Sequence, residues 1–154
     1  MSAKQPDYDV IAIGAGFAGL AVIHYIREAG LSVKVFDRAS DIGGTWTWNR
    51  YPGAATDSES FYYCLTFSKE ILQEWQWSQR YAGWEETLRY MHFVADKCDM
   101  WPHIQLNTDI VSSDYQEDSG WWQLIDGSGT THTSKYFVSA MGMISQPVMP
   151  NIKG

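Results

Sequence analysis

The stretch that decides the fold runs from Tyr8 to Gly19 and reads YDVIAIGAGFAG. Its first half, Tyr8–Ile13, is a short apolar run that a glycine stops, which is typical of a buried strand in a parallel sheet. Apolar residues then recur at helical spacing over Phe17–Ala29, and Gly30 stands where a helix commonly ends. A second apolar run follows at Val33–Asp37. This is a β-α-β unit of about 30 residues, and its right-handed crossover places the two strands side by side.

The glycines between the first strand and the helix have the spacing GxGxxG. Gly14 allows a tight turn, Gly16 lets a pyrophosphate approach the backbone, and Gly19 lets helix and strand pack closely. The amides at the start of the helix would hold the pyrophosphate. Asp37 ends the second strand, where a carboxylate can accept hydrogen bonds from ribose hydroxyls and disfavours a 2′-phosphate. The residues therefore predict a dinucleotide site, and they leave FAD and NAD open.

The rest of the chain completes an α/β fold: a Rossmann-type parallel sheet with an antiparallel β-meander. Residues 38–67 show no clean period, and a stretch of this length without regular structure is usually functional. Helices are expected over Ser68–Trp75, with Ser68 as N-cap, and over Glu85–Asp99. The remaining expected strands are a third parallel strand at His103–Leu106, a meander at Ile110–Tyr115, Trp121–Ile125 and Thr131–Ser134, and a separate last strand at Tyr136–Ala140.

Composition narrows the class of protein. The 154 residues are 45% hydrophobic and 19% charged, which is typical of one globular domain. A net charge of −7 with scattered basic residues argues against nucleic acid as a partner. No apolar run is long enough to span a membrane and no signal peptide opens the chain, so we expect a cytoplasmic protein. Cys64 and Cys98 are expected to be reduced core thiols, and no metal site is expected.

Beyond the glycine turn, several segments resemble those of Baeyer–Villiger monooxygenases, the class B flavoprotein monooxygenases of the cyclohexanone and phenylacetone type. Asp41–Gly53 (DIGGTWTWNRYPG) resembles their GGTW…NRYPG stretch, and shorter matches follow in the same order. These are Thr56–Glu59 (TDSE), Tyr62–Cys64 (YYC), Leu88–Tyr90 (LRY), Val94–Lys97 (VADK) and Phe137–Pro147 (FVSAMGMISQP).

The resemblance implies a cofactor site for FAD. Gly14, Gly16, Phe17 and Gly19 would cradle its pyrophosphate, and Asp37, which is commonly Glu in the family, would hold the adenosine ribose. The other implied cofactor residues are Thr45, Trp46 and Trp48 on the flavin side, Ala55, Thr56 and Asp57 beside the flavin and nicotinamide, Tyr63, and Ile110 at the adenine. Asp57 is the implied catalytic residue.

The implied activity is NADPH-dependent insertion of oxygen from O2 next to the carbonyl of a small-molecule ketone, which gives an ester or lactone. Residues 1–154 would be the N-terminal portion of an FAD-binding domain and end at the linker into an NADPH domain. The family's second glycine fingerprint, for NADPH, and its FxGxxxHxxxW signature do not occur in these residues. Two alternatives stay open: a related flavin monooxygenase that oxidises nitrogen or sulfur, and a truncated fragment without activity of its own.

Some polar and aromatic residues are expected to be structural. Trp75, Trp77, Trp121 and Trp122 are interpreted as packing residues. The four histidines, His24, His92, His103 and His132, match no role in the family and are interpreted as packed or solvent-facing.

Overall fold

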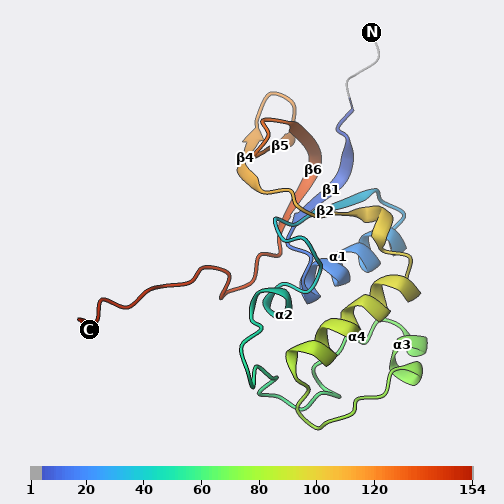
Figure 1. Cartoon of the computed structure of the whole chain (residues 1–154). Coiled ribbons are helices and arrows are strands. Elements are labelled where there is room, and N and C mark those ends of the chain that lie inside the picture. The colour runs from blue at the N-terminus through green and yellow to red at the C-terminus, as the bar shows by residue number, and fades with distance from the viewer. Residues whose placement is uncertain (1–4, 154) are drawn as a thin grey trace.

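A computed structural model describes residues 5–153 (Figure 1). Within them, six strands form one sheet in the order β3-β2-β1-β6-β5-β4. The strands are β1 (Tyr8–Ile13), β2 (Val33–Phe36), β3 (Ile104–Gln105), β4 (Ile110–Gln116), β5 (Trp121–Asp126) and β6 (Thr131–Ser139). The neighbours β3, β2, β1 and β6 run parallel, and β5 and β4 continue the sheet in antiparallel pairs. The expected α/β fold, a Rossmann-type parallel sheet with a meander, is confirmed.

The helices lie on one side of the parallel strands (Figure 1). They are α1 (Phe17–Glu28), α2 (Thr45–Trp48), α3 (Lys69–Glu74) and α4 (Trp84–Lys97), with a 3-10 turn η1 at Trp101–His103. Gly30 follows α1 with a φ of 74°, a conformation that favours glycine. The Ser68 hydroxyl accepts a hydrogen bond from the Ile71 amide at 3.4 Å, as expected for the N-cap of α3.

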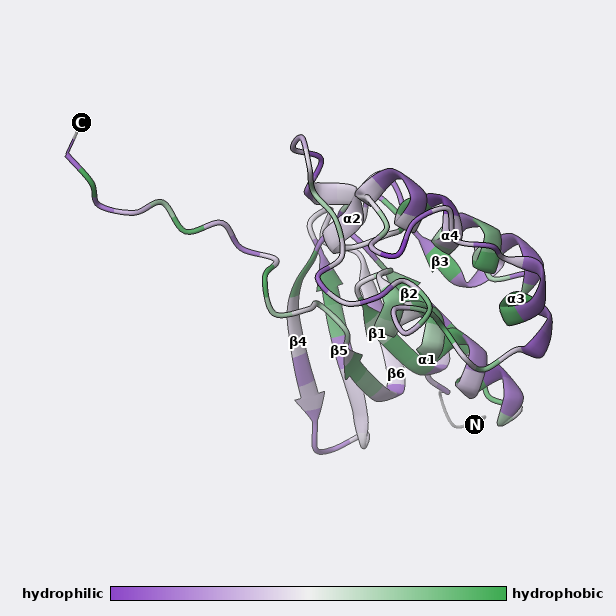
Figure 2. Cartoon of the chain, turned by 90° about the horizontal axis from the view of Figure 1, so that it is seen from below, coloured by the Kyte–Doolittle hydropathy of each residue, from purple (hydrophilic) through white to green (hydrophobic). Residues whose placement is uncertain are grey.

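Alternation along the central strands produces two apolar clusters. Val10 and Ala12 of β1 face a large core with Val33 and Val35 of β2, on the side of the helices. Ile11, between Val10 and Ala12, points the other way and joins a small cluster. The small cluster also contains Phe36 and Leu124, with Tyr8, Ile13, Ile110, Trp122 and Phe137 packed against it. Figure 2 shows the hydrophobic colour on the central strands and the hydrophilic colour on the outer surface of α4.

Two strand boundaries differ from the expectation. Thr131–Ser134 and Tyr136–Ala140 were expected as separate strands, but Thr131–Ser139 is one strand. One edge of β6 pairs with β5 and the other with β1, and both edges are paired at Ser134. The charged Lys135 does not interrupt the strand, because its side chain is exposed and pairs with Asp9 at 2.7 Å.

The third parallel strand is shorter than His103–Leu106. Only Ile104–Gln105 pairs with β2, because the His103 amide donates to the Met100 carbonyl at 3.0 Å and closes η1. At the other end, the Asn107 backbone turns with a φ of 54° and its amide bonds to the Ala39 carbonyl at 2.9 Å. The strand therefore ends where the chain turns back toward β2.

The loop of residues 38–67 contains one helical turn that the sequence pattern did not indicate, α2. Several of its residues are buried although they lack regular structure: Ala39, Ile42, Ala54 and Leu65. After Ala140, in contrast, the chain is exposed and extends away from the sheet as far as residue 153 (Figure 1). Among the helices of the described residues, none combines the length and the apolar character needed to cross a membrane.

Candidate functional site

The first glycine turn lies at the carboxyl end of β1, between the ends of two neighbouring strands. The Gly14 amide donates to the Phe36 carbonyl of β2 at 2.8 Å. Gly14 has a φ of 105°, and a Cβ built on it would lie 2.4 Å from the carbonyl oxygen of Ala140, just after β6. Backbone conformation and space therefore both require glycine at this position.

Gly19 brings helix α1 close to the turn. A Cβ at Gly19 would lie 2.0 Å from the carbonyl oxygen of Gly14 and 3.5 Å from a methyl group of Val35. Because the first contact is with backbone, no side-chain rotation could relieve it. The position requires glycine so that the first turn of α1 can pack against the turn that precedes it.

Gly16 is the N-cap of α1, and its Cβ position faces the protein rather than open space. A Cβ there would lie 3.6 Å from the Cα of Gly44, an ordinary contact. The first α-helical hydrogen bond of α1 runs from the Leu20 amide to the Gly16 carbonyl at 3.1 Å. The amides that precede Leu20 at the start of α1 therefore have no intrahelical acceptor and remain able to bind an anion.

A second glycine turn packs on the first. The Gly43 amide donates to the Ala15 carbonyl at 2.9 Å, and a Cβ at Gly44 would lie 3.2 Å from the Cα of Gly16. Gly43 and Gly44 have φ values of 126° and 54°. Sequence reasoning did not include this pair among the site residues. The signal was the Gly-Gly dipeptide itself, which marks a backbone that turns or comes close to another one.

Asp37 directly follows β2 and is buried. Each of its two carboxylate oxygens accepts a hydrogen bond from a backbone amide. One oxygen accepts from the Ala15 amide at 2.6 Å, and the other accepts from the Ala39 amide at 2.8 Å. Each oxygen has a further lone pair that could accept from another donor. The structure thus brings the acidic residue and the glycine turn together through the backbone.

Three of the expected aromatic residues form one cluster. Trp46 of α2 is buried, and its indole Nε1 donates to the Tyr63 hydroxyl at 3.3 Å. The Tyr63 ring meets the Phe17 ring edge-on, with the centroids 5.0 Å apart. Trp48, by contrast, is 55% exposed and carries the Arg38 guanidinium over its ring at 5.4 Å. Trp48 therefore lies outside the cluster.

The segment Ala55–Asp57 has one buried residue between two exposed ones. The Thr56 amide donates to the Ala82 carbonyl at 2.9 Å, and its buried hydroxyl has no hydrogen-bond partner among the described residues. Ala55 forms an isolated antiparallel bridge with Gly83. The exposed Asp57 carboxylate makes neither a hydrogen bond nor an ion pair within residues 5–153. The structure thus leaves Asp57 free to interact with a ligand and does not join it to the glycine turns.

Two other expected site residues lie at the ends of elements. Thr45 is the first residue of α2, directly after the second glycine turn, and is half-buried. Ile110 begins β4 opposite Asp126 and packs on the small cluster with Ile11 and Phe36. Phe36 is the last residue of β2, so Ile110 lies near the carboxyl end of that strand. Asp37 directly follows the same end.

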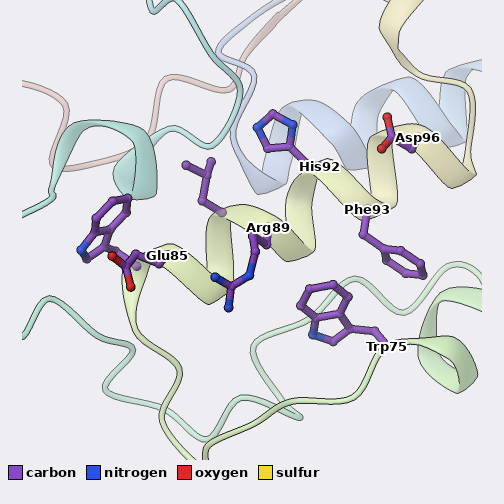
Figure 3. A pocket seen from close by; sticks show the side chains of 8 residues that line it. Trp75, Glu85, Arg89, His92, Phe93 and Asp96 are labelled. Atoms are coloured by element: carbon purple, nitrogen blue, oxygen red, sulfur yellow. The ribbon is translucent and has the colours of Figure 1, made fainter.

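A groove beside α4 does not contain the expected site residues. It has a volume of about 860 Å3 and runs along the outer face of α4 (Figure 3). Its walls are formed by Trp75, Trp84, Glu85, Leu88, Arg89, His92, Phe93 and Asp96. A smaller hollow of about 360 Å3 includes Ala55 together with Gly53, Gly83 and Trp84. The features that favour cofactor binding therefore lie at the glycine turns rather than in either hollow.

The histidines and cysteines are engaged in packing. The His24 ring stacks on the Phe67 ring, with the centroids 4.0 Å apart. The Nε2 atom of His92 lies 2.9 Å from a carboxylate oxygen of Asp41, and that of His132 lies 3.0 Å from a carboxylate oxygen of Asp126. The fourth, His103, has its Nδ1 3.3 Å from the carbonyl oxygen of Val33. Cys64 and Cys98 are free thiols, as expected, but they are half-buried at the edge of the core rather than inside it. Partial burial raises the pKa of both thiols. Within residues 5–153 no cluster of three or more His, Cys, Asp or Glu could hold a metal ion.

The expected packing role of the tryptophans holds for three of the four. Trp75 and Trp77 pack against the large core, and their ring centroids are 5.6 Å apart. The ring centroid of Trp75 is also 5.4 Å from that of Tyr90. Trp122 packs on the small cluster, where its ring is 5.2 Å from that of Phe137. Trp121 is half-buried at the start of β5, outside both clusters.

Comparisons with known proteins show which proteins this chain is similar to. Residues 13–75 match the model of the NAD(P)-binding Rossmann-like domain. A Baeyer-Villiger monooxygenase of Pseudooceanicola batsensis is 45% identical over 96% of this chain, and a phenazine N-monooxygenase of Lysobacter antibioticus is 44% identical over 96%. The solved complex of OTEMO with FAD and NADP is 38% identical over 98% of this chain, with a TM-score of 0.89.

This chain spans only about a quarter of the length of those proteins: 27% of each of the two relatives and 28% of the solved chain. The expected resemblance to Baeyer–Villiger monooxygenases is confirmed over that part.

Proposed function

We propose that this chain is the FAD-binding part of an NADPH-dependent monooxygenase that inserts oxygen next to the carbonyl of a small-molecule ketone. The main observation behind this proposal is that two glycine turns, Gly14–Gly19 and Gly43–Gly44, pack against each other. The backbone amides at the N-terminus of α1, next to these turns, have no intrahelical acceptor. Support for the reaction comes from the similarity to Baeyer–Villiger monooxygenases and to a protein solved with FAD and NADP. Two free thiols also suit the cytoplasmic location that forms part of the proposal.

The residues present fit FAD. The missing side chains of Gly14, Gly16 and Gly44 let the two turns and the end of β6 pack backbone against backbone. The amides at the start of α1 that have no intrahelical acceptor could then bind a pyrophosphate. The Thr56 hydroxyl is buried without a hydrogen-bond partner in the described part of the chain, and a buried hydroxyl normally has one. A polar group of a bound cofactor could supply it. When bound, the flavin ring would supply the redox chemistry that protein side chains lack.

Each residue then has a specific task. The amides at the start of α1 would hold the pyrophosphate, and the free lone pairs of Asp37 would accept from the adenosine ribose. Ile110 would meet the adenine through its backbone. The remaining residues proposed to line the flavin side are Phe17, Thr45, Trp46, Trp48, Ala55, Thr56, Asp57 and Tyr63.

Asp57 is proposed as the catalytic carboxylate. Its exposed position and free oxygens leave it able to face a bound flavin and nicotinamide, and its negative charge would set the electrostatic potential there. NADPH would donate the hydride. Residues 1–154 contain one GxGxxG fingerprint, so we expect the chain alone to catalyse no NADPH-dependent oxygen uptake.

Oxidation of a nitrogen atom is the second candidate reaction. It is favoured by the 44% identity with a phenazine N-monooxygenase. The identity with the Baeyer–Villiger enzyme is 45%, which is nearly the same. The residues of this chain bind the cofactor in either case. The choice between a ketone and a nitrogen atom as the site of oxidation therefore depends on product analysis with a longer protein that contains this chain.

The decisive experiment is titration with FAD of a longer protein that contains this chain, monitored by quenching of flavin fluorescence, because we expect residues 1–154 alone to bind FAD weakly or not at all. We expect saturable quenching for the wild type and its loss in Gly16→Val, because branched methyl groups at residue 16 would push against Gly44. A matched control is Ala29→Val, since Ala29 is exposed at the opposite end of the same helix. Equal affinity of wild type and Gly16→Val would contradict the assignment of the cofactor site.

A further inference from the structure

One side chain ties the glycine turn to the loop after β2. The Asp37 carboxylate accepts the Ala15 amide at 2.6 Å and the Ala39 amide at 2.8 Å, and the residue is only 7% exposed. Within residues 5–153 it forms no ion pair, so backbone amides are its main compensation for burial. Hydrogen bonds from amides to a carboxylate are about twice as strong as those between neutral groups.

The backbone of the same residue joins a third loop. The Asp37 amide donates to the Gln105 carbonyl at 3.0 Å, and the Asp37 carbonyl accepts from the Thr108 amide at 2.9 Å. The Ala39 carbonyl, next to the amide that the carboxylate holds, accepts from Asn107. The segments that follow β1, β2 and β3 at the carboxyl edge of the sheet are therefore connected through Asp37 and its immediate neighbour.

We propose that Asp37 is a positioning residue that holds the glycine turn ready for a pyrophosphate, independently of any contact with ribose. The proposal rests on the proposed function, and it deepens the role of this site. The Ala15 amide lies within the turn between Gly14 and Gly16. With its N–H fixed on the carboxylate, the peptide orientation of the turn is set before a ligand arrives, which lowers the entropy cost of binding.

Charge makes the proposal testable with a ligand that has no ribose. A negative carboxylate near the turn would repel an anion, so its removal alone would strengthen the binding of inorganic pyrophosphate. If the substitution also lets the glycine turn lose its fixed orientation, it would weaken the binding of pyrophosphate. If Asp37 only contacts ribose, Asp37→Asn will bind pyrophosphate as well as the wild type or better. If Asp37 positions the turn, Asn will bind it more weakly, because its amide nitrogen would face one of the two N–H groups without accepting.

The control is Asp9→Asn. Asp9 is at the opposite end of β1, and its carboxylate likewise accepts a backbone amide, that of Ser32 at 2.9 Å, together with a bond from Lys135. This substitution removes a similar set of bonds and leaves the carboxyl edge of the sheet untouched. It therefore separates a general loss of stability from a local effect on the turn.

Two measurements on the ligand-free chain decide the question: calorimetric titration with inorganic pyrophosphate, and hydrogen exchange of the Ala15 amide. We expect Asp37→Asn to weaken pyrophosphate binding about tenfold and to accelerate exchange at Ala15 by a similar factor. For Asp9→Asn we expect unchanged affinity and unchanged exchange at Ala15 relative to other core amides.

Unchanged or tighter pyrophosphate binding by Asp37→Asn would overturn the proposal, as would equal acceleration of exchange at Ala15 in both variants. Should a longer wild-type protein that contains this chain bind neither FAD nor pyrophosphate, the proposed function fails. Exchange at Ala15 would still decide whether Asp37 holds the turn, because this readout needs no ligand.

Discussion

Gly19 packs its bare Cα against the carbonyl group of Gly14: a methyl group on Gly19 would lie 2.0 Å from that oxygen. In an open helix, replacing glycine with alanine stabilises by about 1 kcal/mol. Here we expect Gly19→Ala to destabilise the chain by about 2 kcal/mol or more, because the obstructing atom is backbone and α1 must move. Chemical denaturation monitored by circular dichroism measures the change.

The sign of that change is diagnostic. Ala18→Gly, at the exposed neighbouring position, should cost only about 1 kcal/mol through helix propensity. A Gly19→Ala variant as stable as the wild type would show that the helix and the turn are not packed this closely.

FAD affinity should depend on the size of the residue that replaces Gly16. A Cβ at this position would have an ordinary 3.6 Å contact with Gly44, so Gly16→Ala should still bind FAD. The γ carbons of valine would extend toward the same backbone and separate the two glycine turns, so Gly16→Val should not. FAD affinity from fluorescence titration tests the order wild type, Ala, Val. Loss of binding already with alanine would indicate that the space in front of Gly16 belongs to the ligand instead of Gly44.

Asp126 should make the hairpin between β5 and β6 sensitive to acid. Hydrogen bonds from the Ser128 hydroxyl and from His132 hold the pKa of the Asp126 carboxyl well below its usual range. A lowered pKa in the folded state stabilises the fold at pH values above the usual pKa of about 3.9, and this stabilisation is lost as the pH falls below it. The free energy of unfolding should therefore decline more steeply in wild type than in Asp126→Asn between about pH 4 and pH 2.

Urea denaturation at a series of acidic pH values measures that difference. Asp114→Asn is a suitable control, since Asp114 is an exposed carboxylate of the neighbouring strand β4. Parallel pH profiles for wild type and Asp126→Asn would contradict the prediction.

Asp57 should separate activity from stability. Its carboxylate is exposed and makes no bond within residues 5–153, so Asp57→Ala should change the free energy of unfolding by less than about 0.5 kcal/mol. In a longer protein with monooxygenase activity, the same substitution should slow oxygenation strongly. Product formation and NADPH consumption, measured together, test this effect. Unchanged turnover and coupling would leave Asp57 as an ordinary surface residue.

Local patterns were sufficient to predict most of the elements, although not α2. The run Tyr8–Ile13, the helical spacing after Phe17 and the hydroxyl of Ser68 each act within a few residues, so their structures follow from nearby sequence. The error at Thr131–Ser139 occurred where pairing partners decide. Thr131–Ser139 is one strand because β1 and β5 bind its two edges, and neither partner can be read from the strand's own residues.

The sequence by itself determined that a strand, a glycine turn and a helix follow one another, because the conformations of Gly14 and the residues after it depend on steric limits within the local backbone. Only the tertiary structure decided that Gly44 lies on Gly16 and that Asp37 holds the Ala15 amide. These partners are more than twenty positions apart in the chain. The parallel pairing of β1 with β2 brings Asp37 beside the turn, and the loop that contains Gly44 then folds back over it. Contacts of this kind depend on how whole elements pack, which no local pattern of residue types specifies.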